Sequence, residues 1–428
     1  MSDTPASSGI ASDSEPRWRV TFILILMLVG LYLAAGPLVR LSHWRIPDSN
    51  HALIEANAWR QGRLNLPATS ADPLRSRQQD TAYRDGKVYN VFPPLFTFAS
   101  YAAITLQAAQ RALPEADQVG FYAPWYVALV AVPLPLLGFW GFRTVTGRSE
   151  WAAVLTAYWI LGTPLFCTLA NGPLGHVNTL NHALSNTGLM LIAADMLGKR
   201  RVWPAAIGFI IGVWTRQLTA FYLLAMVWIV WRLSAHRRRE LVVLTAAAVL
   251  GLGTLASLNW AKFGSPFDSG YASLYEGRDD LYAQRYRKYD RLFDPRFIPR
   301  NLRHMSLGLF SVREAQGQLI LEGEPDGTSL WLTCPLLLFA FRDARRWWRD
   351  PVRRALMLAS LIVVLGFLSY HNTGSLQRGQ FRFAMDVIPI WLMVIGPYVI
   401  DGRRRWITLA CLGFSALYFH VLCLTNAV

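Results

Sequence analysis

The stretch "LVVLTAAAVLGLGTLASL", residues 241–258, decides the fold class, because it contains no charged side chain and is long enough to cross a lipid bilayer as a helix. A second such block, "VTFILILMLVGLYLAAGPLV", occupies residues 20–39. Only helices and closed barrels satisfy every backbone polar group inside lipid. Repeated apolar blocks of this length therefore predict an all-α, polytopic helical membrane protein.

The composition and the distribution of charge agree with this prediction. Of the 428 residues, 53% are hydrophobic and 16% are charged, and the net charge is +15. The basic residues form short clusters between the apolar blocks: "GKRR" (198–201), "RRRE" (237–240), "RDARRWWRDPVRR" (342–354) and "DGRRR" (401–405). Cytoplasmic loops of membrane proteins carry such clusters. The positive charge therefore indicates membrane topology and not a nucleic-acid partner.

We expect about 11 transmembrane helices, with the N-terminus in the cytoplasm and each basic cluster on the cytoplasmic side. The predicted spans are 20–39, 120–142, 151–170, 181–197, 203–216, 218–233, 241–261, 327–341, 354–370, 383–400 and 406–424. The segment 91–113 is also apolar, but a full crossing there would place residues 198–201 outside. It is therefore predicted to be re-entrant or only partly inserted.

The spans divide the chain into four parts. Residues 1–18 are polar and Ser-rich and are predicted to be a disordered cytoplasmic tail. Residues 19–261 form a transmembrane module that includes a first outer loop at 40–90, residues 262–326 form a second outer loop, and residues 327–428 form the C-terminal transmembrane helices. Long loops in compact proteins usually carry function, so we expect the functional residues on the outer face.

The first outer loop contains "PDSNHALIEANAWRQGRLNLP" (47–67), in which Asp48 and His51 stand three residues apart. The apolar pattern from 52 to 60 predicts an amphipathic helix that lies on the membrane surface. Asp48 comes just before this helix, and two roles are open for it. It can cap the helix N-terminus, or it can act with His51 on a bound substrate.

Candidate cations also lie at the membrane boundary. Arg84 and Lys87 precede the prolines of "FPPL" (92–95). Lys87 fits either a phosphate-binding role or the role of a lysine that anchors a helix at the interface. Arg216 stands between two apolar runs, where it is either a functional cation or a turn residue of a helical hairpin. Ionisable groups at membrane depth are candidates for function.

Further candidates stand at the ends of other predicted spans. Arg378 and Arg382 lead into the span at 383–400, where Arg382 can either pair with Asp386 one turn later or bind a substrate. His182 lies near the outer end of an earlier span, where it is either a structural hydrogen-bonding residue or a ligand-binding one.

An acid, a histidine and separated cations together suit a substrate with an anionic head embedded in lipid. Arginine and lysine bind phosphate, and a carboxylate can accept the proton of an incoming hydroxyl or amine. A divalent metal, Mg²⁺ or Mn²⁺, is compatible with carboxylates beside a phosphate, although no ligand spacing in the sequence requires one.

The order of several motifs resembles the GT-C superfamily of membrane glycosyltransferases, in the branch of the protein O-mannosyltransferases, the aminoarabinose transferases and their bacterial relatives. Residues 47–66 are similar to the first-loop acid and helix of that branch, and "DTAYRDGKVYNVFPPL" (80–95) is similar to its Gly-Lys-x-Tyr…Pro-Pro segment. "KFGSPFDSGYASLYEG" (262–277), "GTSLWLTCPLLLFAF" (327–341) and "GQFRFAMDVIPIWL" (379–392) resemble its later segments.

The resemblance implies a membrane glycosyltransferase with a catalytic module at 19–261. It implies sugar transfer from a polyprenyl-phosphate donor on the extracytoplasmic face of the plasma or bacterial inner membrane, with inversion in a single displacement. The acceptor, a lipid, a glycan or a protein, stays open. Carried over, Asp48 matches the acid that activates the acceptor or organises the site, and Lys87 and Arg382 match positions near the donor phosphate. Arg216 resembles an arginine that follows a span in the middle of the module, and we include it among the donor phosphate-binding candidates.

The chain departs from these relatives at two positions. Ser49 follows Asp48 where many relatives have a second acid, and Phe92 stands before the prolines where relatives have a charged residue. Two other function classes also stay open: a transporter or flippase of lipid-linked or anionic substrates, and a non-catalytic membrane scaffold of the same fold. A transporter of this size usually contains paired repeats, and none is visible in the sequence.

Overall fold

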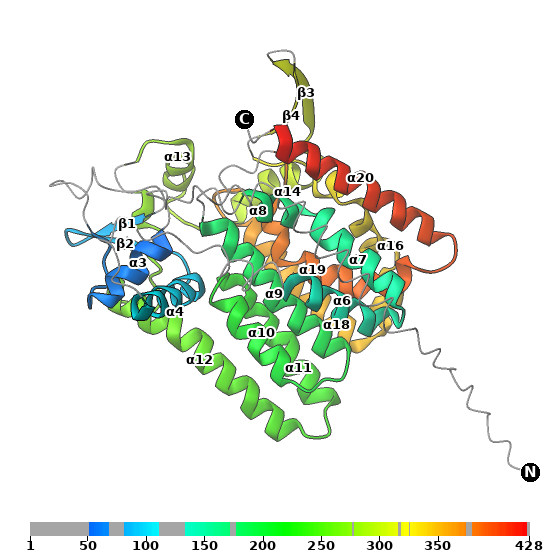
Figure 1. Ribbon diagram of the computed structural model, residues 1–428, viewed down its shortest axis with the longest axis horizontal. Coiled ribbons are helices and arrows are strands. Elements are labelled where there is room, and N and C mark those ends of the chain that lie inside the picture. Colours follow the sequence, from blue (N-terminus) through cyan, green and yellow to red (C-terminus); the bar gives the residue numbers. More distant parts are fainter. Residues whose placement is uncertain are drawn as a thin grey trace, which may run out of the picture.

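The computed structural model of the chain describes residues 51–67, 81–110, 133–171, 177–275, 278–315, 318–324, 326–373 and 379–425. Within these ranges the protein is mainly helical, as expected, with two antiparallel hairpins (Figure 1). Three of the described helices are long and apolar enough to cross a membrane: α12 (Arg237–Phe263), α18 (Pro351–Leu368) and α20 (Arg404–Thr425). The predicted tail at 1–18 and the predicted span at 20–39 lie outside the described residues.

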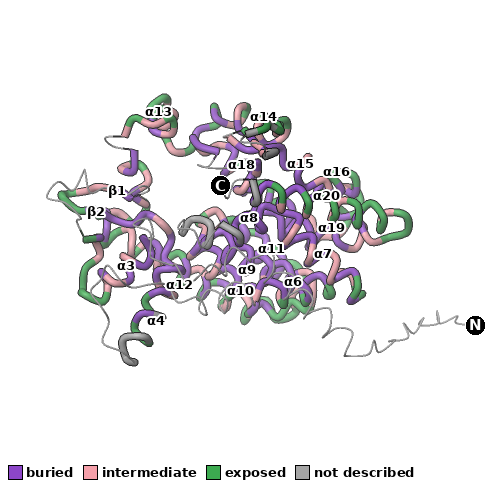
Figure 2. Tube along the Cα trace, turned by 45° about the horizontal axis from the view of Figure 1, so that its top comes forward, coloured by how far each residue is buried: buried purple, intermediate pink, exposed green. Residues whose placement is uncertain are grey.

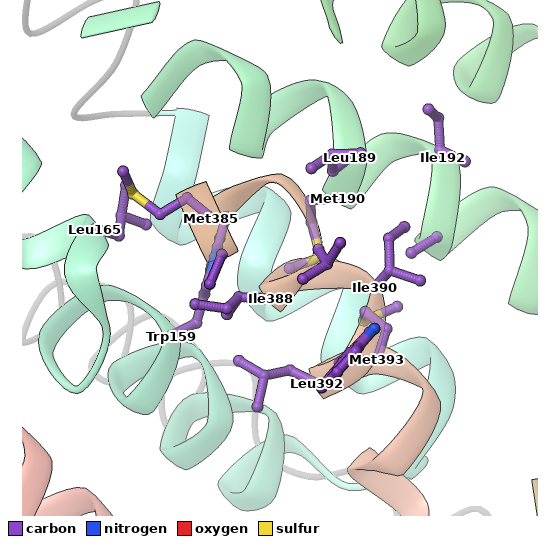
Figure 3. Packing of buried hydrophobic residues seen from close by; sticks show 14 of the residues in the cluster. Trp159, Leu165, Leu189, Met190, Ile192, Met385, Ile388, Ile390, Leu392 and Met393 are labelled. Carbon is purple, nitrogen blue, oxygen red and sulfur yellow. The ribbon is translucent and has the colours of Figure 1, made fainter. Parts of the chain in front are cut away.

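The centre of the helical bundle is α19 (Ile388–Val399), which packs against α6 (Pro133–Thr146), α7 (Ser149–Leu161) and α9 (Val177–Leu197). Its sequence "IPIWLMVIGPYV" is apolar on every side, as expected of a helix that is buried all round. Figure 3 shows Ile388, Ile390 and Leu392 of α19 packed among core side chains that include Trp159 and Met190. This burial fixes the position of the short helix η9 (Arg382–Asp386), which leads directly into α19.

Two predicted spans are interrupted at prolines. The span expected at 151–170 consists of α7 and α8 (Pro164–Asn171), separated at Gly162. The span expected at 327–341 is divided into α15 (Leu330–Thr333), η8 (Pro335–Leu338) and α16 (Phe339–Arg342). Proline has no backbone N–H and cannot continue a regular helix, and Cys334 before Pro335 has the non-helical angles φ −129° and ψ 61°. The prediction of one continuous helix at 327–341 was therefore wrong.

The remaining helices lie beside this core. The α10 helix (Trp203–Val213) packs closely on α9 and is followed by η5 (Gln217–Phe221) and α11 (Tyr222–Leu233). Both α10 and α11 contact α12, which runs along one side of the bundle (Figure 1). Apolar side chains on the outer faces of α12 and α20 are exposed, among them Val242, Val249, Trp260 and Leu417. Figure 2 shows the exposed course of α20 next to the buried interior.

Part of the segment expected as the first outer loop is folded against one end of α12 (Figure 1). We call residues 51–67 and 81–110 the first-loop unit; it contains α3 (His51–Arg60), β1 (Thr81–Arg84), β2 (Lys87–Asn90) and α4 (Leu95–Gln110). The helix predicted at 52–60 is confirmed as α3. The hairpin turns at Asp85 and Gly86, whose φ values of 51° and 76° suit a two-residue turn.

A buried ion pair joins the first-loop unit to α12. Glu55 of α3 has no exposed surface, and one of its carboxylate oxygens pairs with the ammonium of Lys262 near the end of α12. The other oxygen accepts hydrogen bonds from Asn90 at 2.6 Å and from Thr97 at 2.8 Å. Because a buried carboxylate is costly unless it is paired and hydrogen-bonded, this contact fixes α3 relative to the bundle.

The segment 262–326, expected as an outer loop, has a defined structure. It contains η6 (Ser273–Tyr275), α13 (Leu281–Arg287), η7 (Pro295–Phe297), α14 (Ile298–Leu307), β3 (Phe310–Ala315) and β4 (Gln318–Gly323), and the β3–β4 hairpin projects from the molecule in Figure 1. The amide of Asn301 donates to the carbonyls of Leu368 and Tyr370, at 2.8 and 2.7 Å. The segment is thereby held on the end of α18.

Asp326 is the main ionic contact of this segment. Its carboxylate accepts two hydrogen bonds from Arg285, at 2.7 and 3.0 Å, and one each from Arg300 and Thr373, both at 2.7 Å. Burial favours the neutral acid, but these donors outweigh that effect and lower the pKa of Asp326 below its ordinary value. Asp326 therefore stays ionised and links α13 and α14 to the chain beyond α18.

We expect Asp326→Asn to lower the free energy of unfolding at pH 7 by about 1.5–3 kcal/mol, the range for hydrogen bonds to a charged group. A carboxyl with a lower pKa in the folded protein stabilises the fold above the unfolded pKa of about 3.9, and this stabilisation is lost progressively as the pH falls from there through the lower folded pKa. Thermal unfolding in detergent should thus show the difference from wild type beginning to shrink near about pH 4 and continuing to shrink at still lower pH. The matched control is Asp279→Asn, which removes an exposed acid; an equal effect of both substitutions would contradict the prediction.

Candidate functional site

A pocket lies where the start of α9, the turn between α10 and η5, the end of α18 and the start of η9 meet. Its cavity volume is about 170 Å³, and part of the pocket is open to the surroundings. Its polar walls come from Asn181, His182, Thr215, Arg216, Gln217, Ser269, Asn372 and Arg382. Its aromatic walls come from Phe92, Tyr271, Tyr275, Phe293, Phe367, Tyr370 and Phe383. Among the described lining residues there is no acid.

Arg216 is the best-anchored cation of the pocket. It follows the end of α10, and its side chain donates three hydrogen bonds to the carboxylate of Asp386, at 3.2, 3.1 and 2.9 Å. Asp386 is completely buried, whereas Arg216 keeps part of its side chain exposed. A guanidinium held from behind by a buried carboxylate has a fixed orientation, so its free surface can bind an anion without a large loss of side-chain entropy.

Arg382 and His182 stand beside Arg216 in the same pocket. The guanidinium carbons of Arg216 and Arg382 lie 5.2 and 5.6 Å from the centre of the Phe383 ring, so this ring is within cation–π distance of both. The Nδ1 atom of His182 lies 3.7 Å from a carboxylate oxygen of Asp386. Two arginines thus line the pocket and no acid is among its described lining residues, so the pocket suits a negatively charged ligand.

The side-chain oxygen of Asn181 has no hydrogen-bond partner among the described residues. Its side chain is only 2% exposed, and its Oδ1 atom accepts no hydrogen bond within the described part of the chain. A buried polar atom without a partner is costly, and Asn181 is one of the residues that line the pocket. A ligand hydroxyl at this position would satisfy it.

The aromatic side chains come mainly from the 262–326 segment and from the chain after α18. Tyr271, Tyr275 and Phe293 belong to the first of these, and Tyr370 to the second. Tyrosines combine an apolar ring face with a hydroxyl group, so this wall can contact both the faces and the hydroxyls of a ring-shaped polar ligand.

The helices that bring residues to the pocket each have a basic segment at their other end. The α9 helix starts at the pocket and ends before Lys199–Arg201, and α19 runs from the pocket to the arginines at 403–405. The α18 helix begins after 345–349 and ends at the pocket with Phe367, and α11, which follows the pocket-lining η5, ends before 237–239. The bundle thus has a basic end and an opposite end that carries the pocket.

The structure brings together three of the residues that the sequence predicts for the site, namely His182, Arg216 and Arg382. His51 is buried at the start of α3, and its ring stacks at 6.3 Å on Phe92, which lines the pocket. His51 thus lies behind the wall of the pocket.

The two cations of the first-loop hairpin lie elsewhere. Lys87 is exposed beside the hairpin turn and does not line the pocket, and Arg84 forms a half-exposed ion pair with Asp268 at 2.6 Å. Asp48 and Arg378 lie outside the described residues.

The sequence interpretation missed two features of the site and its support. The first is the pairing of two acids in apolar surroundings: Glu55 was not a candidate and Asp386 was considered only as a partner of Arg382, whereas their partners are Lys262 and Arg216, far away in the chain. Each acid and each partner is a single charge within or beside an apolar run, which is a usable signal for a tertiary ion pair. The second is the aromatic wall, for which the sequence offers no periodic pattern.

Within the described residues, no group of three or more His, Cys, Asp or Glu side chains has the arrangement of a metal site. No known family, no curated protein and no solved structure matches the chain. The function is therefore inferred from the residues and the pocket alone.

Proposed function

We propose that the chain is an integral membrane protein of about 11 transmembrane helices, located in the plasma or bacterial inner membrane, with the pocket on the extracytoplasmic side. The basic segments at one end of the bundle support this orientation, because positive residues are enriched on the cytoplasmic side. The exposed apolar faces of α12 and α20 support contact with lipid. In this arrangement the segment 91–113, which includes α4, is the re-entrant or partly inserted element, and α3 lies at the membrane interface.

We further propose that the protein is a glycosyltransferase of the GT-C type that uses a polyprenyl-phosphate sugar as donor. The observation that carries this proposal is the pocket itself: two arginines that face a space without described acids, next to an aromatic wall and the unpartnered amide oxygen of Asn181. The arginines suit the donor phosphate, and the aromatic wall and Asn181 suit a sugar ring. The position between helix ends suits a ligand whose long apolar part stays in lipid.

The proposed reaction is an inverting displacement in one step. Asp48 takes the proton of an acceptor hydroxyl or amine, and the acceptor atom forms a bond to the anomeric carbon of the sugar. The bond between that carbon and the phosphate oxygen breaks, and the polyprenyl phosphate leaves with the electron pair. Arg216 and Arg382 stabilise the charge that this leaving group gains. His51 contributes to the first-loop side of the site, and a bound Mg²⁺ or Mn²⁺ is compatible with this chemistry.

Donor binding distinguishes the pocket arginines from the other candidate cations. We expect Arg382→Gln to raise the Kd for a polyprenyl-phosphate sugar by about 10- to 100-fold, because a hydrogen bond to a charged group contributes about 1.5–3 kcal/mol. Lys87→Gln removes the same charge outside the pocket and should change the Kd by less than about threefold.

The measurement is equilibrium binding of a fluorescent or radiolabelled donor to protein in nanodiscs. Both variants should first be compared with wild type by thermal unfolding, so that a folding defect is recognised. Equal losses of affinity in the two variants, or a larger loss in Lys87→Gln, would place the donor phosphate outside this pocket.

A further inference from the structure

A second cleft lies at the basic end of the bundle, where α11 ends and where α12 and α18 begin. Its cavity volume is about 330 Å³, and it is lined by Trp228, Trp231, Arg232, Arg237 and Arg354, among others. The α18 helix contributes Phe367 to the pocket described above and Pro351 and Arg354 to this cleft. The two sites therefore lie at opposite ends of α18.

The cleft concentrates positive charge. Arg232, Arg237 and Arg354 all line it, and no carboxylate is among its described lining residues. Within the part of the chain that the structure describes, none of these three guanidinium groups pairs with an acid; Arg237 lies over the ring of Trp231 at 5.6 Å instead. Arginines without an acidic partner, oriented by aromatic rings, are suited to bind phosphate.

An exposed apolar stripe on α11 leads into the cleft. Its members are Leu224, Val227, Trp228 and Trp231, which are 59%, 38%, 37% and 57% exposed. The spacing of three, four and seven residues places them on one face of the helix. The last two also line the cleft, so the apolar stripe and the cationic site are continuous.

We propose that this cleft binds the headgroup of an anionic phospholipid of the leaflet on the basic side of the bundle. The three arginines contact the headgroup phosphate, and the acyl chains lie along the apolar stripe of α11. Basic clusters next to membrane helices recognise anionic lipids in this way, and tryptophans prefer the level of the headgroups. The lipid site goes beyond the proposed glycosyltransferase activity; it depends only on the membrane placement of the helices.

The test is lipid binding to the purified full chain in detergent, measured by native mass spectrometry or by displacement of a fluorescent lipid. The probes are phosphatidylglycerol, which carries one negative charge, phosphatidylcholine, which carries none overall, and glycerol phosphate, which has the phosphate without acyl chains. The test variant combines Arg232→Gln, Arg237→Gln and Arg354→Gln. The matched control combines Arg200→Gln, Arg403→Gln and Arg405→Gln, three exposed arginines outside the cleft at the same end of the bundle.

We expect wild type and the control variant to prefer phosphatidylglycerol over phosphatidylcholine. The cleft variant should bind phosphatidylglycerol about a hundredfold more weakly, since each arginine near an anionic lipid contributes a factor of about five. Unchanged thermal unfolding of the cleft variant would exclude a folding defect as the cause. Equal losses in both triple variants, no preference for the anionic lipid, or binding of glycerol phosphate as tight as that of the lipid would each overturn the proposal. The binding readout requires no sugar transfer, so failure of the proposed activity would not affect it.

Discussion

Replacing Arg216 by methionine is expected to lower the free energy of unfolding by about 3–5 kcal/mol, because it leaves the carboxylate of Asp386 buried and without its cation. All three hydrogen bonds from Arg216 to Asp386 are lost in this variant. The loss should appear as a lower midpoint in thermal or denaturant unfolding of the protein in detergent. Donor binding should also weaken, since the pocket loses one of its two arginines.

The matched control is the double variant Arg216→Met with Asp386→Leu. Replacing both members of a buried ion pair by apolar residues of similar volume is often neutral for stability, so the double variant should recover most of the lost stability. It should not recover donor binding, because the cation is still missing. A double variant as unstable as Arg216→Met alone would show that packing, and not the unpaired charge, causes the loss.

Lys262→Met should have an effect on stability of similar size, about 3–5 kcal/mol, because it leaves the carboxylate of Glu55 buried without a cation. The hydrogen bonds from Asn90 and Thr97 remain, but they do not neutralise the charge. Since Lys262 and Glu55 join α12 to α3, hydrogen exchange should increase first in residues 51–60.

The control for this prediction is Lys87→Met, the same substitution at an exposed position of the first-loop unit. It should change the free energy of unfolding by less than about 0.5 kcal/mol. Similar destabilisation by both substitutions, or hydrogen exchange that rises uniformly over the whole chain in Lys262→Met, would argue against a specific role of the ion pair.

The long apolar helices were predictable from the sequence, and the reason is physical. The run at 241–261 has no charged residue that could end it, and the structure continues it in both directions as α12, from Arg237 to Phe263. The helix expected at 354–370 is found as α18, which begins at Pro351, where the fixed φ of proline favours a first helical residue. The broken segment at 327–341 was not predictable from hydropathy alone, because its apolar residues give the same signal in one helix or in three short ones.

The cations of the pocket were also predictable, but their partners were not. Arg216, Arg382 and His182 stand out as polar residues at the ends of apolar runs, and all three line the pocket. The sequence offered a pair between Arg382 and Asp386, one helical turn apart. In the structure, both carboxylate oxygens of Asp386 accept hydrogen bonds from Arg216, 170 residues away in the chain. The helix η9 has 3₁₀ geometry with three residues per turn, so residues four apart are not on the same face. A pairing rule for α-helices cannot identify such a tertiary contact.

The central proposal is sugar transfer from a lipid-linked donor, and its most direct test is transfer in proteoliposomes. Wild type and Asp48→Asn are compared with a panel of radiolabelled polyprenyl-phosphate sugars, and donor binding is measured in parallel. We expect wild type to transfer sugar from at least one donor, and Asp48→Asn to bind that donor normally while its transfer rate falls by at least about a hundredfold, as expected for the loss of a general base. Full transfer by Asp48→Asn would remove this acid from the mechanism. Binding of donors without any transfer by wild type would contradict the glycosyltransferase proposal and favour a transporter or a scaffold.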